Sequence, residues 1–360
     1  MKLKPALFAA LVAGLAFGAA QAQTKWDMPT PYPDSNFHTK NVKQFAEDVK
    51  AASGGKLEIV VHSNASLIKH PEIKRAVQTG QVPIGQILIS VLANESPIYA
   101  FDSNPFLAPN YSAAKKLLRV ARPYVEKRLD AQGIKVLFAV PWPPQGIYTK
   151  KPLNSAADLN GVKFRTYSPV TSDFAKRLGA IPTTVQVPEI PQAFLTGLVD
   201  AMITSGATGV DTQAWDYLKY YTDAEAFLPF NFVLVNKEAF AKLDPALQKQ
   251  VMAISAKAEE QGWAMSEENN EGYKKTMAGH GITVQKPNAK LSLELNAIGK
   301  SMAQEWMKKT GPDAQAILNE LLSAGLNQGA GGNGQGHFPF RPATDLPPNP
   351  GPGRDGAFLS

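Results

Sequence analysis

The sequence predicts an α/β protein built as two lobes, and three features of the chain indicate this fold. Segments with the pattern of strands are repeatedly followed by segments with the 3.6-residue pattern of helices. Three prolines stand within the four residues 141–144, where they would make a stiff extended crossing because each proline fixes φ. A helical pattern over 245–278 is long enough to run along two lobes. With 360 residues, 44% of them hydrophobic, the chain can form two cores.

The first lobe is expected over 23–141 and 230–260, with strands and helices in alternation. This succession predicts a mainly parallel sheet with helices on both faces. The run 84–90 is continuously apolar, as expected for a strand that is covered on both sides. Ser35 or Asn36 can cap the first helix. The expected strands are 25–28, 57–62, 84–90 and 134–140, and two further helices are expected at 71–79 and 112–131.

The second lobe is expected over 142–229 and 280–324. Glycines and prolines separate its predicted strands and helices. The long helix, 245–278, has proline at its first turn and is expected to span both lobes. The expected strands are 146–149, 162–167, 180–187 and 201–204, a return strand to the first lobe at 232–236, and 282–285. The expected helices are 171–178, 190–196, 291–309 and 313–322.

Arg165 is the leading candidate for a binding residue. Its segment, 162–167, alternates apolar and polar side chains and predicts a strand with one buried face. A helix that Thr171 can cap follows, so Arg165 lies near the carboxyl end of a strand, where ligands bind in open α/β sheets. Its planar guanidinium fork suits a carboxylate. The alternative is a surface arginine that pairs with an acid on the neighbouring strand.

The two ends of the chain are expected to lie outside the fold. Residues 1–22 have a basic start, a short apolar run and a small-x-small site, which predicts a cleaved signal peptide and export to the periplasm. An uncleaved anchor helix is the alternative. Residues 325–360 are rich in glycine, proline and asparagine and are expected to be disordered. Their glycine run lacks the lysine and the flanking strand of a phosphate loop.

The sequence offers little for an enzyme. It has no cysteine, and its five histidines do not have the spacing of a metal site, so neither a metal nor a cofactor is expected. A Gly-x-Ser-x-Gly nucleophile motif is also missing. The net charge of +6 is spread along the chain without a basic run, so nucleic acid is not an expected partner. Distant residues can still meet in a fold, and a periplasmic enzyme on a two-lobed scaffold stays an alternative.

Several ordered motifs resemble one known family. Residues 151–165 read KPLNSAADLNGVKFR and are similar to the signature of solute-binding proteins of TRAP (tripartite ATP-independent periplasmic) transporters. The similarity continues at LGAIP (178–182), VPE (187–189), LTGLVD (195–200), YLKYYT (217–222) and VNK (235–237).

The resemblance implies a two-lobed periplasmic binding protein, type II-like, with a long helix spanning both lobes. Such a protein closes on a small organic acid and presents it to TRAP membrane permease subunits; we expect a monomer. Arg165 aligns with the family arginine that binds the ligand carboxylate. An ABC-type or sensor-linked binding protein would share this fold and stays open as a further alternative.

Two departures from the family pattern bear on the ligand. The family's second arginine is absent near the strand 146–149, where Tyr148 stands, and its frequent asparagine is replaced near Thr204 and Ser205. Several aromatic side chains could then surround one carboxylate site, although aromatics also fill cores. The candidate ligand-binding residues are Arg165, Trp142, Tyr148, Tyr167, Thr204, Ser205, Phe232 and Asn36.

This set predicts an aromatic or branched-chain monocarboxylate as the ligand. A pocket with one cation and apolar walls would leave the second charge of a C4-dicarboxylate buried without a partner, and this is costly. Sialic-acid-like sugars are disfavoured as well. If a dicarboxylate binds, a second cation such as Lys69 or Lys150 is required.

Overall fold

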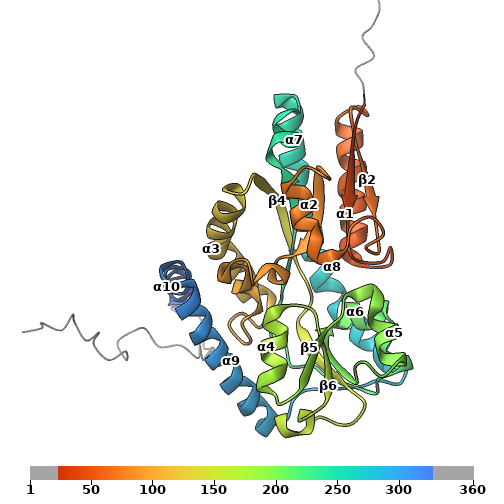
Figure 1. Cartoon of the computed structure of the whole chain (residues 1–360), viewed down its shortest axis with the longest axis vertical. Coiled ribbons are helices and arrows are strands. Elements are labelled where there is room, and N and C mark those ends of the chain that lie inside the picture. Colours follow the sequence, from red (N-terminus) through yellow and green to blue (C-terminus); the bar gives the residue numbers. More distant parts are fainter. Residues whose placement is uncertain (1–22, 327–360) are drawn as a thin grey trace, which may run out of the picture.

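A computed structural model describes residues 23–326, which form a mixed α/β protein of two lobes (Figure 1). The first lobe contains a parallel pair of strands, β1 and β2, and a sheet in the order β3-β10-β4. The second lobe contains a six-stranded sheet in the order β11-β9-β5-β8-β6-β7. The first-lobe strands are β1 (Thr24–Pro29), β2 (Leu57–His62), β3 (Ile84–Leu88), β4 (Ile134–Pro141) and β10 (Phe230–Asn236). The second-lobe strands are β5 (Gln145–Thr149), β6 (Lys163–Thr166), β7 (Ile181–Thr184), β8 (Ala201–Ser205), β9 (Tyr220–Thr222) and β11 (Thr283–Gln285).

The expectation of a mainly parallel sheet in the first lobe was wrong for the sheet β3-β10-β4, although β1 and β2 are parallel. In the first lobe β10 runs antiparallel to both β3 and β4, because it returns from the second lobe in the opposite direction. In the second lobe β5 is antiparallel to β8 and β9, whereas β6 is parallel to both of its neighbours. The prediction of a fully covered strand is confirmed for β3, in which every residue is buried.

The helices lie mostly where the hydrophobic pattern places them. Asn36 caps α1 by accepting a hydrogen bond from the amide of His38. Thr171 does not cap α4; Ser168 does, and Thr171 at the third helical position bonds back to the Ser168 amide. The short helices α6 and α7 and the strand β9 have no counterpart in the sequence prediction. The helices are α1 (Phe37–Ala52), α2 (Ile73–Gln78), α3 (Tyr111–Asp130), α4 (Pro169–Arg177), α5 (Ile190–Leu195), α6 (Gly206–Asp211), α7 (Lys237–Ala241), α8 (Pro245–Gly279), α9 (Ala289–Thr310) and α10 (Pro312–Leu326).

The strand β6 is covered on both faces, not on one as its alternation indicated. Phe164 and Arg165 are both almost fully buried. Phe164 belongs to the core cluster that also contains Phe174 of α4. Arg165 is on the opposite face and lines a cavity between the lobes. The charged side chain is therefore buried by the first lobe rather than exposed to solvent.

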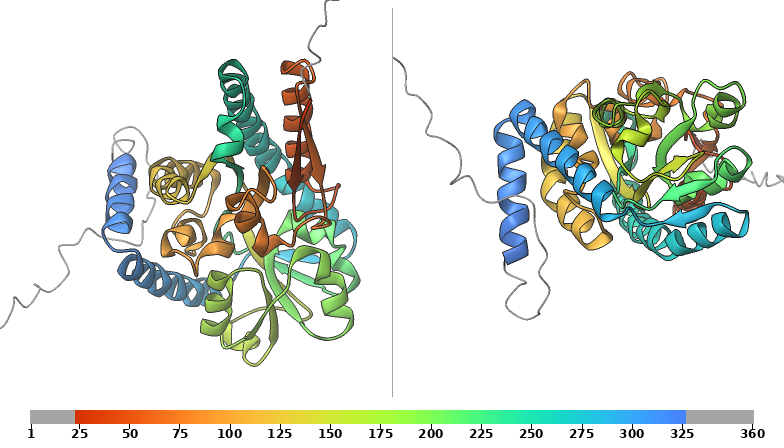
Figure 2. Two further views of the ribbon diagram at one scale, coloured as in Figure 1. Left: turned by 45° about the horizontal axis from the view of Figure 1, so that its top comes forward. Right: turned by 90° about the horizontal axis from the view of Figure 1, so that it is seen from below.

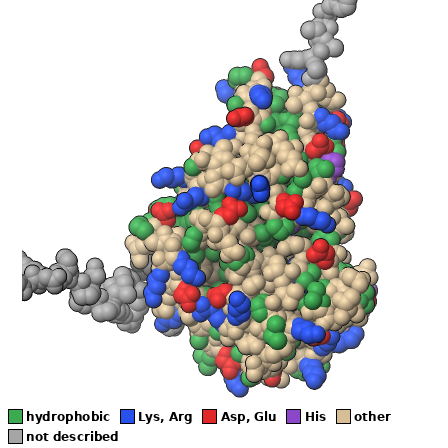
Figure 3. All heavy atoms as spheres, viewed as in Figure 1, with side chains coloured by type: hydrophobic (Ala, Val, Ile, Leu, Met, Phe, Trp, Pro, Cys, Tyr) green, Lys and Arg blue, Asp and Glu red, His purple; other side chains and the backbone are tan. Residues whose placement is uncertain are grey.

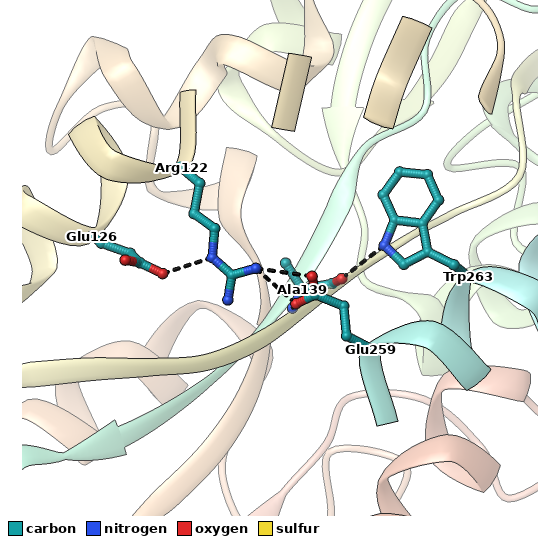
Figure 4. A network of polar contacts seen from close by, with 5 residues as sticks. All are labelled: Arg122, Glu126, Ala139, Glu259 and Trp263. Atoms are coloured by element: carbon teal, nitrogen blue, oxygen red, sulfur yellow. Dashed lines mark hydrogen bonds and ion pairs between the residues drawn. The ribbon is translucent and has the colours of Figure 1, made fainter. Parts of the chain in front are cut away.

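The long helix α8 passes from one lobe to the other, as expected (Figure 1). A polar network attaches it to the first lobe (Figure 4). Arg122 of α3 donates to both carboxylate oxygens of Glu259, at 2.9 and 2.8 Å. Glu259 also accepts from the backbone amide of Ala139, and the indole of Trp263 donates to the Ala139 carbonyl. In the second lobe, Lys274 of the same helix pairs with Asp223 at 3.0 Å.

The last two helices leave the second lobe. Trp306 near the end of α9 donates its indole hydrogen to Pro97 O, and Ile317 and Leu321 of α10 enter a core shared with α3. Figure 2 shows α10 beside α3 at one side of the molecule. The C-terminal part of 280–324, expected in the second lobe, therefore packs on the first.

Some expectations fall on residues that the structure does not describe. The signal peptide (1–22) and the glycine-rich run of the tail lie outside the described residues, although α10 continues to Leu326, two residues into the predicted tail. Within 23–326, none of the helices combines the length and the apolar character that a bilayer span requires. Figure 3 shows acidic and basic side chains intermixed on the face it presents.

Candidate ligand-binding site

A cavity lies between the two lobes, with about 320 Å³ of empty space that includes part open to solvent. Both lobes and both chain crossings contribute to its walls. The first lobe provides Tyr32, His70 and Leu88, and the crossings provide Trp142, Gln145 and Pro229. The second lobe provides Arg165, Tyr167, Gln186, Val187, Thr204 and Thr208. Arg165 is the one lysine or arginine among these lining residues.

Arg165 is a buried cation without an acidic partner in the described part of the chain. Its side chain is 1% exposed, and its Nε donates to the carbonyl of Val185 at 2.9 Å. Nη1 makes a longer contact of 3.5 Å with the Ile203 carbonyl. Burial lowers the pKa of Arg165 to about 10, so the guanidinium keeps its charge at neutral pH. The alternative of an ion pair with an acid on the neighbouring strand is therefore not what the structure has.

The remaining N–H groups of Arg165 are available to a ligand. A guanidinium carries five donors, and the backbone contacts use two of them. The guanidinium also lies 5.1 Å from the centre of the Tyr167 ring, a cation–π contact that helps to fix its plane. A buried, charged fork with free donors suits a carboxylate better than any neutral group.

Three aromatic side chains of the cavity wall have their polar atoms satisfied by the protein. The hydroxyl of Tyr32 and the indole N–H of Trp142 both donate to Asn231 Oδ1, at 2.9 and 3.1 Å. Their rings meet edge to face with centroids 4.9 Å apart. The hydroxyl of Tyr167 donates to Gln145 Oε1 at 3.0 Å. Each phenol therefore has its hydrogen engaged and can offer the cavity an oxygen acceptor only.

The structure brings four of the predicted residues to the cavity: Arg165, Trp142, Tyr167 and Thr204. Tyr148 lies in the core beneath the second sheet, where its hydroxyl donates to Ser205 O at 3.0 Å. Phe232 is fully buried in the first-lobe core. Both positions follow from the face of the strand on which each side chain lies. Each points from its sheet into packed helices rather than toward the other lobe.

Ser205 and Asn36 act at helix ends, outside the cavity wall. Ser205 caps α6 by accepting from the Thr208 amide at 3.2 Å. Asn36 caps α1, and its Nδ2 also donates to Asp211 Oδ2 at 2.6 Å. Ser35 donates to the other oxygen of Asp211 at 2.9 Å. Because Asp211 belongs to α6 of the second lobe, these two hydrogen bonds join the lobes at the edge of the site.

Sequence reasoning missed five polar or aromatic wall residues: Tyr32, His70, Gln145, Gln186 and Thr208. Gln186 could have been found, because it follows β7, which is parallel to β6, and parallel strands end at one edge of a sheet. Tyr32 stands in a loop and His70 opens a short 3₁₀ helix, and neither belongs to a recognisable motif. His70 Nδ1 lies 2.9 Å from Gln186 Oε1, a contact between residues 116 positions apart that exists because the two lobes meet. No cluster of His, Cys, Asp or Glu within 23–326 could hold a metal.

Fold and site together define a binding protein that encloses a small anion between two lobes, and comparison with known proteins gives its family. A family model described as DctP, bacterial extracellular solute-binding protein, family 7, matches residues 30–310. The chain belongs to this family, the solute-binding proteins of TRAP transporters, which are receptors rather than enzymes. The resemblance found in the sequence motifs is thereby confirmed.

Three solved structures are similar over most of the chain. DctP7 of Bordetella pertussis, an extracytoplasmic solute receptor binding pyroglutamic acid, is 50% identical with a TM-score of 0.82, covering 83% of this chain and 99% of that one. DctP6 of Bordetella pertussis, also a receptor binding pyroglutamic acid, is 48% identical with a TM-score of 0.82, covering 83% and 100%. A marine metagenome TRAP protein specific for pyroglutamate is 39% identical with a TM-score of 0.82, covering 84% and 99%.

Proposed function

We propose that this protein captures pyroglutamate, or a similar small cyclic monocarboxylate, in the periplasm and delivers it to TRAP membrane permease subunits. The observation that carries the proposal is Arg165, a buried guanidinium with free donors and without an acidic partner among the described residues. An anionic ligand would supply the missing charge, and a carboxylate would accept two parallel hydrogen bonds from the fork.

The residues around the cavity and the similar structures support a small acid with one carboxylate. Most of the wall surface is apolar, but two glutamines, two threonines and a histidine add neutral polar groups beside the cation. Proteins that are 50%, 48% and 39% identical to this chain bind pyroglutamate, a ring of this kind with one carboxylate.

Aromatic monocarboxylates are the second candidate. Tyr32, Trp142 and Tyr167 offer three aromatic faces near Arg165, which would suit a benzoate-like ring. Dicarboxylates fit less well because the cavity wall has no second cation for the other carboxylate. Lys69 is exposed and outside the wall, and Lys150 pairs with Asp200 at 2.6 Å away from the cavity.

Closure of the lobes is part of the proposed mechanism. The crossing before β5 runs beside the crossing before β10, with Trp142 N donating to Pro229 O at 2.8 Å and Gln145 N to Phe227 O at 3.0 Å. A hinge here would let the lobes separate to admit the ligand. A ligand that touches both lobes binds the closed state more tightly and so favours closure. Small-angle scattering should show compaction at saturation; an unchanged radius would contradict the hinge.

Native mass spectrometry and thermal-shift screening against a carboxylate library test the proposed function. We expect one unchanged acid bound per chain, and a monomer. A ligand at 100 times its dissociation constant should stabilise the protein by roughly 2.7 kcal/mol. Steady conversion of the bound acid to a product would contradict a capture function and favour an enzyme.

A further inference from the structure

We propose that Gln186, oriented by His70, recognises a neutral hydrogen-bond acceptor on the ligand, so that the site selects acids that carry a carbonyl group besides the carboxylate. This inference rests on the proposed function, because it concerns the specificity of the same cavity. It assigns a role to two wall residues that approach each other from opposite lobes.

A backbone amide fixes the proton positions of the His70 ring. The amide of Leu88 donates to His70 Nε2 at 3.2 Å, and an amide can only donate, so Nε2 carries no hydrogen. Burial lowers the pKa of His70 to about 4, which leaves the ring neutral at pH 7. A neutral imidazole without hydrogen on Nε2 has it on Nδ1. His70 is thus a donor at Nδ1, and Gln186, 2.9 Å away, must present its carbonyl oxygen there.

This arrangement engages the oxygen of Gln186 and leaves its amide hydrogens without a partner among the described residues. Its Oε1 is occupied by His70, whereas its Nε2 makes no hydrogen bond with any described residue. The two phenols can act only as acceptors toward a ligand. The hydroxyls of Tyr32 and Tyr167 already donate their hydrogens to Asn231 and Gln145. The cavity therefore combines a cation, a neutral donor and neutral acceptors.

The ligand complementary to this combination carries a carboxylate, a carbonyl and an N–H. The carboxylate suits Arg165, the carbonyl accepts from Gln186, and the N–H donates to a phenol oxygen. A lactam acid such as pyroglutamate has all three groups on one small ring. Benzoate and cyclopentanecarboxylate have the carboxylate alone and would leave the amide nitrogen of Gln186 unpaired in a closed site, which costs binding energy.

The recognition is linked to closure. His70 lies in a short 3₁₀ helix of the first lobe (His70–Glu72), and Gln186 follows β7 of the second lobe. Gln186 is therefore oriented by His70 only when the lobes are together. A ligand with a suitable acceptor would receive the hydrogen bond from Gln186 in the closed state, in which it also contacts Arg165.

Calorimetric titrations with three acids measure separately what the ring carbonyl and the ring N–H of the ligand contribute to binding. Pyroglutamate has both ring groups, its lactone analogue keeps the carbonyl but lacks the N–H, and cyclopentanecarboxylate lacks both. The ratio of dissociation constants of cyclopentanecarboxylate and the lactone isolates the acceptor contact. In the native protein we expect cyclopentanecarboxylate to have a dissociation constant about tenfold higher than the lactone, which corresponds to one hydrogen bond.

The same ratio in variants tests the assignment. Gln186→Met and His70→Phe should bring it close to one, and Gln192→Met, at an exposed glutamine of the same lobe, should leave it unchanged. An unchanged ratio in Gln186→Met would overturn the inference while pyroglutamate binding leaves the proposed function intact. If the native protein binds none of the three acids, the proposed function fails and the inference with it.

The proton position on His70 has its own spectroscopic signature. In protein labelled with ¹⁵N-histidine, two-bond proton–nitrogen spectra distinguish the tautomers of the five histidines, and His70→Phe assigns the signal. We expect a neutral His70 ring with hydrogen on Nδ1 in the ligand-bound protein. An Nε2–H tautomer or a charged ring would overturn the arrangement and with it the donor role of Gln186.

Discussion

Replacing Arg165 should weaken ligand binding, and the loss of affinity should grow with the number of hydrogen bonds that the replacement removes. Two of its five N–H groups are engaged by Val185 O and Ile203 O, which leaves three for a ligand. A carboxylate that takes two charge-assisted bonds of about 1.5–3 kcal/mol each gains about 3–6 kcal/mol. Arg165→Ala should therefore raise the dissociation constant by about 10²–10⁴-fold. Arg165→Lys keeps the charge and loses the fork, so about 10–100-fold is expected.

Calorimetric titration with pyroglutamate measures these changes, and circular dichroism checks that each variant is folded. Arg177→Lys is the matched control, because Arg177 lies in the same lobe and bonds to Asp173 and Glu305 outside the cavity. Its affinity should equal that of the native protein. Binding by a folded Arg165→Lys within about twofold of the native protein would refute the carboxylate fork, since the expected loss is one charge-assisted bond. An alanine variant that does not fold would make the role of Arg165 structural.

Further predictions concern stability. An added Cβ at Gly262 of α8 would meet both methyl groups of Val140, one at 2.8 Å, so Gly262→Ala should cost about 1–3 kcal/mol in the free energy of unfolding. Gly272→Ala, on the same helix with nothing within 4 Å, should be neutral or stabilising by up to about 1 kcal/mol in denaturant unfolding; equal effects would contradict the packing of α8. Burial raises the pKa of Asp102, which accepts from the Phe230 amide, from 3.8 to about 7. Between these values the native state keeps a proton that the unfolded state releases, so stability should fall as pH rises, by up to about 1.4 kcal/mol per pH unit. Asp102→Asn should remove this slope, and an identical pH profile in the variant would show that other groups cause it.

Local sequence pattern predicted much of the fold. The start of α8 at Pro245 and most helix positions follow from apolar periodicity and from end signals such as proline and glycine. The position of Arg165 at the carboxyl end of a strand followed from the same kind of reasoning. The direction of β10 did not, because antiparallel return from another lobe leaves no mark in a short apolar segment.

The site was harder to predict because it depends on which face of each strand meets the other lobe. Tyr148 and Trp142 are both aromatic and close in sequence, yet Trp142 lines the cavity and Tyr148 packs in a core. Composition cannot separate these two cases. The contact between His70 and Gln186 depends on the approach of two lobes, which local pattern does not encode.

The most direct test of the central claim, capture of one small monocarboxylate at Arg165, is competition calorimetry on protein freed of bound ligand by unfolding and refolding. Pyroglutamate, benzoate, succinate and malate are compared under one set of conditions. The single cation of the cavity wall predicts that pyroglutamate binds at least about tenfold more tightly than either dicarboxylate, because a second carboxylate would be buried without a partner. Equal or tighter binding of succinate or malate would contradict the claim.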